Sequence, residues 1–169
     1  MQEETKAYIA GFLDGDGSIM FQLIERKGYI YGYQIRASVC FYQDSGHKEG
    51  LKWLKERIGY GYIRDRNDGV SDYTIVGPER VREVLVMVKP YVVFKAAHVA
   101  RALELLDAME GKRKPNVEEF LALAKLVDSY ANLNYSKKKK NNATKVAEYL
   151  NRKGLLTPVT TDFAAMSSE

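Results

Sequence analysis

The run from Ile9 to Gly17 (IAGFLDGDG) constrains the fold of this chain more than any other segment. Ala7, Gly11 and Gly15 recur at i, i+4 and i+8, so a helix through them carries a face of small residues that a second helix can approach almost to backbone contact. Asp16 falls at the carboxyl end of this helix, where the helix dipole disfavours a carboxylate unless a cation is bound beside it. The run therefore predicts a close-packing helix that delivers a carboxylate to a composite metal site.

Composition sets the broad class of the protein. The 169 residues are 46% hydrophobic and 28% charged, which is ordinary for one soluble domain with a real core. The net charge of +4 and pI of about 9.0 favour a polyanionic partner without requiring one. Cys40 is the only cysteine, which excludes an intrachain disulfide and a cysteine-rich zinc site. No apolar run approaches the ~20 residues that span a bilayer and the N-terminus lacks a signal-peptide pattern, so we expect a soluble protein in a reducing compartment, with no membrane partner.

The order of periodic segments predicts two hairpins, each followed by a helix. Apolar residues alternate with polar ones over residues 18–26 and 34–41, which indicates a half-buried hairpin. A helix over 45–57 leads to a second hairpin that turns at residues 67–69 (NDG), and a further helix lies between Pro78 and Pro90. The remainder reads as helices over 95–110, 116–130 and 143–153. We predict one domain, residues 1–155, and a flexible tail, residues 156–169.

Several blocks of this sequence resemble one family. The run IAGFLDGDG resembles the LAGLIDADG motif of homing endonucleases. Residues 59–66 (GYGYIRDR), 71–73 (SDY), 89–91 (KPY) with Lys95, and 133–134 (LN) extend the similarity over about residues 8–150. A second copy of the motif is missing, as in the single-motif, homodimeric members. The resemblance implies an α+β fold: an αββαββα core with a four-stranded antiparallel saddle sheet, followed by additional C-terminal helices.

The resemblance also implies an active site. Asp16 would supply a metal carboxylate and Gly15 a backbone carbonyl to the same ion. Gln43 would position solvent, and Lys95 would stabilise charge near the scissile phosphate. The implied cofactor is Mg²⁺, with Mn²⁺ able to substitute and Ca²⁺ supporting binding without cleavage. The role of Asp14 stays open between capping and ligation.

The acidic run has two other interpretations. An isolated DGDG sequence is more often only a helix stop that leads into a strand. The spacing of Asp14, Asp16, Ser18 and Glu25 also matches an EF-hand calcium loop, but Ile19 stands where that loop requires glycine. The later blocks of the sequence favour the nuclease site.

Polar residues of the predicted strands are candidates for reading double-stranded DNA in the major groove, because arginine suits guanine, glutamine suits adenine and aspartate can accept from cytosine. Two apolar positions could contact a thymine methyl, tyrosines near the first hairpin loop could reach bases or sugars, and a lysine run would contact phosphates. His47 is a further candidate for a phosphate or water contact. The full set of candidates is Gln22, Ile24, Arg26, Tyr29, Tyr31, Tyr33, Gln34, Arg36, Ser38, Cys40, His47, Arg64, Arg66, Asp72, Thr74, Lys137, Lys138, Lys139 and Lys140.

The predicted function is site-specific cleavage of both strands of a long pseudo-palindromic duplex, leaving short 3′ overhangs. Ala7, Gly11 and Gly15 would form the homodimer interface and bring two Asp16 side chains together on a two-fold axis. The alternatives are an RNA maturase that assists intron splicing, for which RNA would be a partner, and a DNA-binding protein that does not cleave. We expect an intracellular protein, cytoplasmic in a prokaryote and in the matrix or stroma if an organelle genome encodes it.

Overall fold

The fold is described from a computed structural model that covers residues 1–111, 114–134 and 140–156. Lys137, Lys138 and Lys139 of the predicted lysine run lie outside the described residues, as does the predicted tail after Leu156. The elements in chain order are α1 (Glu3–Asp16), β1 (Gly17–Glu25), β2 (Tyr33–Asp44), the 3-10 turn η1 (Ser45–His47), α2 (Glu49–Ile58), β3 (Tyr62–Asp65), β4 (Val70–Val76), α3 (Pro78–Val88), α4 (Ala96–Met109), α5 (Val117–Ala131) and α6 (Ala143–Arg152). None of the described helices has the length and apolar character needed to cross a membrane.

The four strands form one antiparallel sheet in the order β1-β2-β4-β3. The long first hairpin pairs Gly17 with Phe41 at one end and Glu25 with Tyr33 at the other. The second half of β2 also pairs with β4, and the short β3 forms the far edge. This arrangement confirms the predicted α+β class, the αββαββα order and the additional C-terminal helices.

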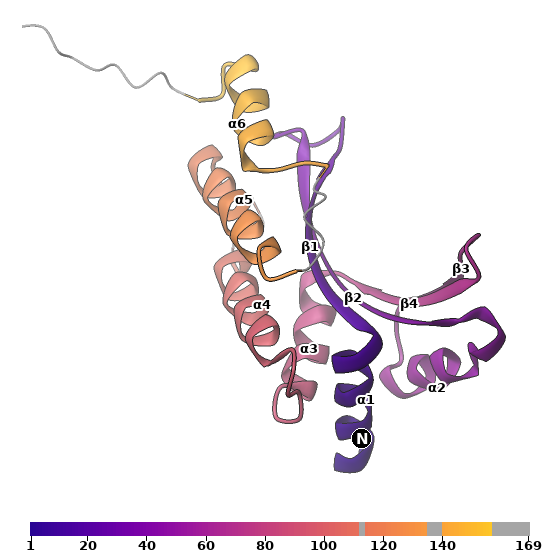
Figure 1. Cartoon of the computed structure of the whole chain (residues 1–169). Helices are drawn as coiled ribbons and strands as arrows, with labels where there is room; N and C mark the ends of the chain where they lie inside the picture. Colours follow the sequence, from indigo (N-terminus) through magenta and orange to yellow (C-terminus); the bar gives the residue numbers. More distant parts are fainter. Residues whose placement is uncertain (112–113, 135–139, 157–169) are drawn as a thin grey trace, which may run out of the picture.

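The two faces of the sheet have different environments. Figure 1 shows the helices on the convex side of the curved sheet, with the concave side left uncovered. The strand residues that face the helices are almost fully buried and form the core: Ile19, Phe21, Leu23, Ala37, Val39, Phe41, Tyr73 and Ile75. Period-two alternation thus places the apolar residues under the helices and the polar residues on the open side.

Helix α1 buries one stripe and exposes another. Ile9, Ala10 and Leu13 are fully buried against the sheet and α3. Gly11 and Gly15 are exposed, and a Cβ atom added at either would meet nothing within 4 Å. The small-residue face of α1 is therefore open in the single chain.

The C-terminal helices pack on β1. Helix α5 begins with a capping box in which Asn116 and Glu119 exchange hydrogen bonds, as the sequence predicts. The Tyr130 ring lies edge-on to Phe21 at 5.0 Å, and its hydroxyl donates to the Ile19 carbonyl at 3.2 Å. These contacts fix α5 along the outer edge of the sheet.

The tyrosines of the first hairpin do not all lie where the sequence analysis placed them. Tyr29 is 50% exposed in the loop. Tyr31 instead donates to the Pro115 carbonyl at 2.7 Å and packs on the Phe120 ring, and Tyr33 is 7% exposed with its ring edge-on to Tyr149. The prediction that Tyr31 and Tyr33 reach DNA is corrected, because both anchor the C-terminal helices on the covered side.

The hairpin loop provides a test of this packing. Gly32 has φ of +69°, and a Cβ there would lie 2.3 Å from the Tyr149 ring, whereas Gly28 in the same loop has nothing within 4 Å. We expect Gly32→Ala to lower the free energy of unfolding by roughly 1–3 kcal/mol through strain and displacement of α6. Gly28→Ala should leave it nearly unchanged. Urea denaturation followed by circular dichroism measures both, and equal stability of the two variants would contradict the packing.

Candidate active site

The Asp14 carboxylate joins the end of α1 to the start of α4. It is 9% exposed, and it accepts backbone N–H bonds from Val93 at 2.6 Å, Phe94 at 3.1 Å and Lys95 at 2.9 Å. These donors precede α4 and lack partners within that helix, so a carboxylate both satisfies them and complements the helix dipole. Of the two roles left open for Asp14, the structure supports capping.

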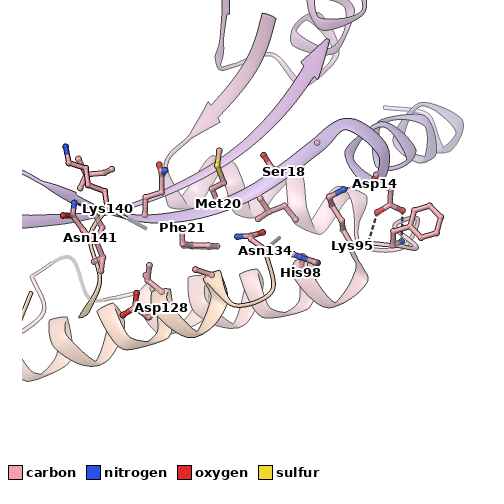
Figure 2. A pocket seen from close by; sticks show the side chains of 18 of the residues that line it. Asp14, Ser18, Met20, Phe21, Lys95, His98, Asp128, Asn134, Lys140 and Asn141 are labelled. Atoms are coloured by element: carbon pink, nitrogen blue, oxygen red, sulfur yellow. Dashed lines mark hydrogen bonds between the residues drawn. The ribbon is translucent and has the colours of Figure 1, made fainter. Parts of the chain in front are cut away.

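Lys95 is held at the carboxyl end of α1. Its ammonium group donates to the Asp14 backbone carbonyl at 2.5 Å (Figure 2). An ammonium group has three donors, so two remain for another oxygen. The structure thus brings Lys95 beside the segment that carries Gly15 and Asp16.

Asp16 and Gly15 occupy the exposed last turn of α1. Within the described residues, no hydrogen bond or ion pair reaches the Asp16 carboxylate. Gln43 lies two residues beyond Phe41, the partner of Gly17, and therefore near the same end of α1. Its side-chain oxygen accepts from the Asp44 backbone N–H at 3.0 Å. The predicted catalytic residues share one end of the sheet.

The metal-binding groups at this end of α1 suit a cation shared between two chains better than a cation bound within one chain. In the described part of the chain, no group of three or more His, Cys, Asp or Glu residues could hold a metal ion. One protomer offers the Asp16 carboxylate and the Gly15 carbonyl. Mg²⁺ binds through one or two carboxylates and leaves positions for water and substrate phosphate, so these residues fit Mg²⁺ when a second copy and a phosphate complete the site.

A groove of about 880 Å³ runs from this end of α1 between β1 and helices α4 and α5 (Figure 2). Lys95 lies at one end and Lys140 at the other, with Ser18, Gln22 and His98 between them. His98 Nε2 lies 3.0 Å from the Leu133 carbonyl, which connects α4 to the end of α5. The sequence analysis did not select His98, because a lone histidine in a helix carries no distinguishing pattern. The positively charged lysines at the two ends of the groove suit a negatively charged nucleic-acid strand.

The open face of the sheet carries the other predicted contacts. Gln22, Arg26, Arg64 and Arg66 are exposed, and Ile24, Gln34 and Arg36 are half-buried. His47 is exposed at the end of η1, and Lys140 is exposed beyond α5. These residues are available to a partner that lies on the concave side.

Four predicted base contacts are instead buried at the centre of this face. Ser38 is 2% exposed, Asp72 1%, and Thr74 and Cys40 4% each. Burial raises the pKa of the Cys40 thiol, and the Asp72 carboxylate, through its hydrogen bond and its charge, raises the pKa of the Arg64 guanidinium. The prediction that these four side chains contact bases directly does not match their burial, because neighbouring side chains cover them.

The comparisons with known proteins agree with this geometry. The sequence profile described as LAGLIDADG endonuclease matches residues 9–99, more than half of the chain. This chain belongs to the LAGLIDADG endonuclease family. The DNA endonuclease I-CvuI of Chlorella vulgaris is 31% identical over 148 residues, covering 88% of this chain and 91% of that protein. The DNA endonuclease I-CreI of Chlamydomonas reinhardtii is 30% identical over 148 residues, covering 88% and 90% respectively.

Solved structures of family members share the fold. A crystal structure of I-CvuI with its target in 2 mM Ca superposes with a TM-score of 0.84 at 28% identity, covering 92% of this chain and 98% of that one. A second structure of I-CvuI, with the I-CreI target in 2 mM Mg, superposes equally well and contains uncleaved DNA. The archaeal intron-encoded homing endonuclease I-Vdi141I, complexed with DNA, has a TM-score of 0.78 at 16% identity, covering 92% of this chain and 99% of that one.

The capping role of Asp14 predicts that substitutions of Asp14 and Asp16 change the free energy of unfolding differently. Asp14→Ala leaves three partly buried backbone N–H groups without their acceptor, so we expect the free energy of unfolding to fall by on the order of 3 kcal/mol. Asp16→Asn removes an exposed carboxylate from a helix carboxyl end and should leave stability unchanged or slightly higher. Urea denaturation of both variants checks this, and a stable Asp14→Ala protein would disprove the capping role.

Proposed function

We propose that this protein is a homodimeric, Mg²⁺-dependent, site-specific DNA endonuclease of the homing type. The observation that carries the proposal is the end of α1, where an exposed Asp16 carboxylate lies beside Lys95 on a helix whose small-residue face is open. The membership of the family and the named activities of I-CvuI and I-CreI support it.

The dimer forms through α1. Ala7, Gly11 and Gly15 let the two copies of the helix approach closely, because no side chain holds them apart. A two-fold axis between the helices brings two Asp16 carboxylates and two Gly15 carbonyls together. Each chain thereby contributes half of the catalytic site, which accounts for the absence of a three-ligand cluster among the described residues of one protomer.

The chain's own residues bind and orient the reacting groups. Asp16 and the Gly15 carbonyl would hold the metal ion, and bound Mg²⁺ supplies Lewis-acid stabilisation of the attacking and leaving oxygens. Gln43 orients a solvent water toward the phosphate. Lys95, anchored by one donor to the Asp14 carbonyl, directs its remaining donors at the phosphate oxygens, where negative charge develops. The reaction is hydrolysis, so no covalent enzyme intermediate is needed.

Recognition uses the concave face of the sheet. Each protomer's exposed Gln22, Arg26, Arg64 and Arg66 read one half-site in the major groove, and the dimer reads a long pseudo-palindromic duplex. Lys140, with the neighbouring lysines of the sequence, neutralises phosphates. Cleavage of both strands leaves short 3′ overhangs. The protein would act inside the cell, or in the matrix or stroma of an organelle whose genome encodes it.

The metal dependence is best tested on the chain's own target. I-CvuI bound to the I-CreI target in 2 mM Mg contains uncleaved DNA, so a bound duplex and Mg²⁺ at that concentration did not suffice there. Ca²⁺ should support binding by this chain without cleavage, and Mn²⁺ should replace Mg²⁺.

The catalytic role of Asp16 is tested by Asp16→Asn. Duplexes recovered from a randomised library with the wild-type chain in Ca²⁺ serve as the probe. We expect the variant to bind them with nearly wild-type affinity and to lose cleavage in Mg²⁺ by at least about 100-fold, because a neutral amide cannot replace a metal-binding carboxylate. Gel separation of the products measures this. Cleavage by Asp16→Asn at the wild-type rate would remove the proposed site.

The dimer interface is tested by Gly11→Leu. A leucine on the small-residue face keeps the helices apart, so we expect a monomer by sedimentation and no cleavage of the same duplexes. Ala100→Leu places the same leucine side chain at an exposed position of α4 and serves as the control. The interface would be wrong if Gly11→Leu remained dimeric.

A further inference from the structure

A chain of hydrogen bonds crosses three strands at the centre of the open face. Arg64 Nε and Nη2 donate to Asp72 Oδ1 at 3.1 and 2.7 Å. The Thr74 hydroxyl donates to Asp72 Oδ2 at 2.8 Å, and Cys40 Sγ lies 3.2 Å from that hydroxyl oxygen. Because the single hydroxyl proton is engaged by Asp72, the Cys40 thiol is the donor to Thr74. We name these four residues the Asp72 network.

The register of the sheet brings the network together. Arg64 on β3 pairs directly with Asp72 on β4, and Cys40 on β2 pairs directly with Thr74 on β4. Asp72 and Thr74 are two residues apart and so share a face of β4. Each side chain of the network thus has its hydrogen-bond partner directly opposite or diagonally across on the sheet. The strand register therefore fixes the network, and no loop residue takes part.

The members differ sharply in exposure. The Asp72 side chain is 2% exposed, whereas the Arg64 side chain is 63% exposed. A buried carboxylate is costly unless it is paired and hydrogen-bonded, and Asp72 accepts from both Arg64 and Thr74. Only Arg64 reaches from the network to the surface where a duplex would lie.

The way Asp72 holds Arg64 leaves a defined group of donors free. Asp72 binds the edge made by Nε and Nη2, which uses two of the five guanidinium N–H groups. The end formed by Nη1 and Nη2 keeps one outward N–H on each nitrogen. Such a fork matches the O6 and N7 acceptors that guanine presents in the major groove.

We infer that Asp72 and Thr74 are positioning residues that fix Arg64 for bidentate recognition of one guanine in each half-site. Their side chains specify a base without touching it, Asp72 by orienting the guanidinium and Thr74 by orienting the Asp72 carboxylate. This inference rests on the proposed DNA recognition. A loosely held arginine loses side-chain entropy on binding and reaches more than one base, whereas a fixed one is pre-organised.

A neighbouring pair shows the contrast. Arg66 Nη2 donates to Asp68 Oδ2 at 2.5 Å, but the two side chains are 40% and 51% exposed. The contrast lies in the carboxylate, because Asp72 is 2% exposed and accepts from the Thr74 hydroxyl, whereas the second oxygen of the exposed Asp68 accepts from the Val70 backbone N–H at 3.3 Å. Arg66 is therefore not locked in the same way, and the inference concerns Arg64 alone.

The test is a base-preference profile. Duplexes randomised within one half-site are selected in Ca²⁺ with wild type, Arg64→Ala, Asp72→Asn, Thr74→Val and Thr74→Ser. Arg64→Ala identifies the base pair that Arg64 reads. We expect Asp72→Asn to lower the preference for guanine at that same base pair by roughly tenfold, and Thr74→Val to lower it less. Thr74→Ser, which keeps the hydroxyl, should retain it.

Asp65→Asn is the matched control. Asp65 lies on β3 next to Arg64, pairs with Lys48 at 2.8 Å and accepts from Ser71 at 2.7 Å, and its side chain is on the opposite side of the strand. Its loss removes the same charge and an ion pair, here one with a 57% exposed carboxylate, and breaks no hydrogen bond of the network. The profile of Asp65→Asn should match that of the wild type at the guanine position.

The affinity of Asp72→Asn for random DNA distinguishes a positioning role of Asp72 from a general loss of structure. Asp72→Asn removes a negative charge near the duplex, so binding to random DNA should stay equal or become tighter while the guanine preference falls. The double variant with Arg64→Ala should show no further loss at that base pair, because both changes remove one interaction. If Asp72→Asn does not fold, Thr74→Val, which is nearly isosteric, carries the test.

Two results would overturn the inference. An unchanged guanine preference in the folded Asp72 and Thr74 variants would show that Arg64 needs no support. Relaxation at a different base pair in Asp72→Asn would mean that Asp72 reads a base itself. Failure of the wild-type chain to enrich any duplex would overturn the proposed function as well, so the two failures are distinguishable.

Discussion

The arrangement of the active-site end depends on the Asp14 carboxylate. It ties the last turn of α1 to the segment that begins α4 through three backbone N–H groups, and the Lys95 ammonium returns a bond to the Asp14 carbonyl. Two helices that are distant in sequence are thereby locked end to end, so Asp16 and Lys95 keep a fixed relation. Asp16, two residues later, is exposed and has no hydrogen-bond or ion-pair partner among the described residues, so its carboxylate is free to bind a cation. Two acids separated by one glycine thus have opposite roles, because one is buried among donors and the other faces solvent.

Much of the fold could be predicted from local pattern. Period-two alternation correctly assigned the buried faces of β1 and β2, and the capping pair Asn116 and Glu119 correctly placed the start of α5. The start of α2 differs from the predicted one, because a side chain competes there with the helix for a backbone N–H. The Asp44 carboxylate accepts from the Gly46 N–H, so a 3-10 turn precedes α2 and the helix begins at Glu49. Such local competition is decided by geometry that the alternation of residues does not encode.

The placement of the proposed catalytic residues was predictable from the sequence, and the burial of the proposed recognition residues was less so. Asp16, Gly15, Gln43 and Lys95 were selected because the motif and its supporting blocks resemble a known family, and the structure gathers them at one end of the sheet. Alternation placed Asp72 and Thr74 on the correct face, but it cannot show that neighbours cover them, since burial there depends on strand register and side-chain packing. Tyr31 and Tyr33 were misplaced for a similar reason, because the helices that cover them come about 80 and 115 residues later in the chain.

The central claim is that one chain supplies half of a symmetric nuclease. The open face of α1 can accept a second copy of the helix, and the incomplete ligand set in the described part of one protomer can be completed by that copy. The most direct measurement assembles the wild-type protein on a selected duplex in Ca²⁺, adds Mg²⁺, and maps the breaks on both strands at nucleotide resolution. We predict one break per strand, symmetric about the centre of the pseudo-palindrome and leaving short 3′ overhangs. A stable complex in which neither strand breaks, or breaks placed without symmetry about that centre, would contradict it.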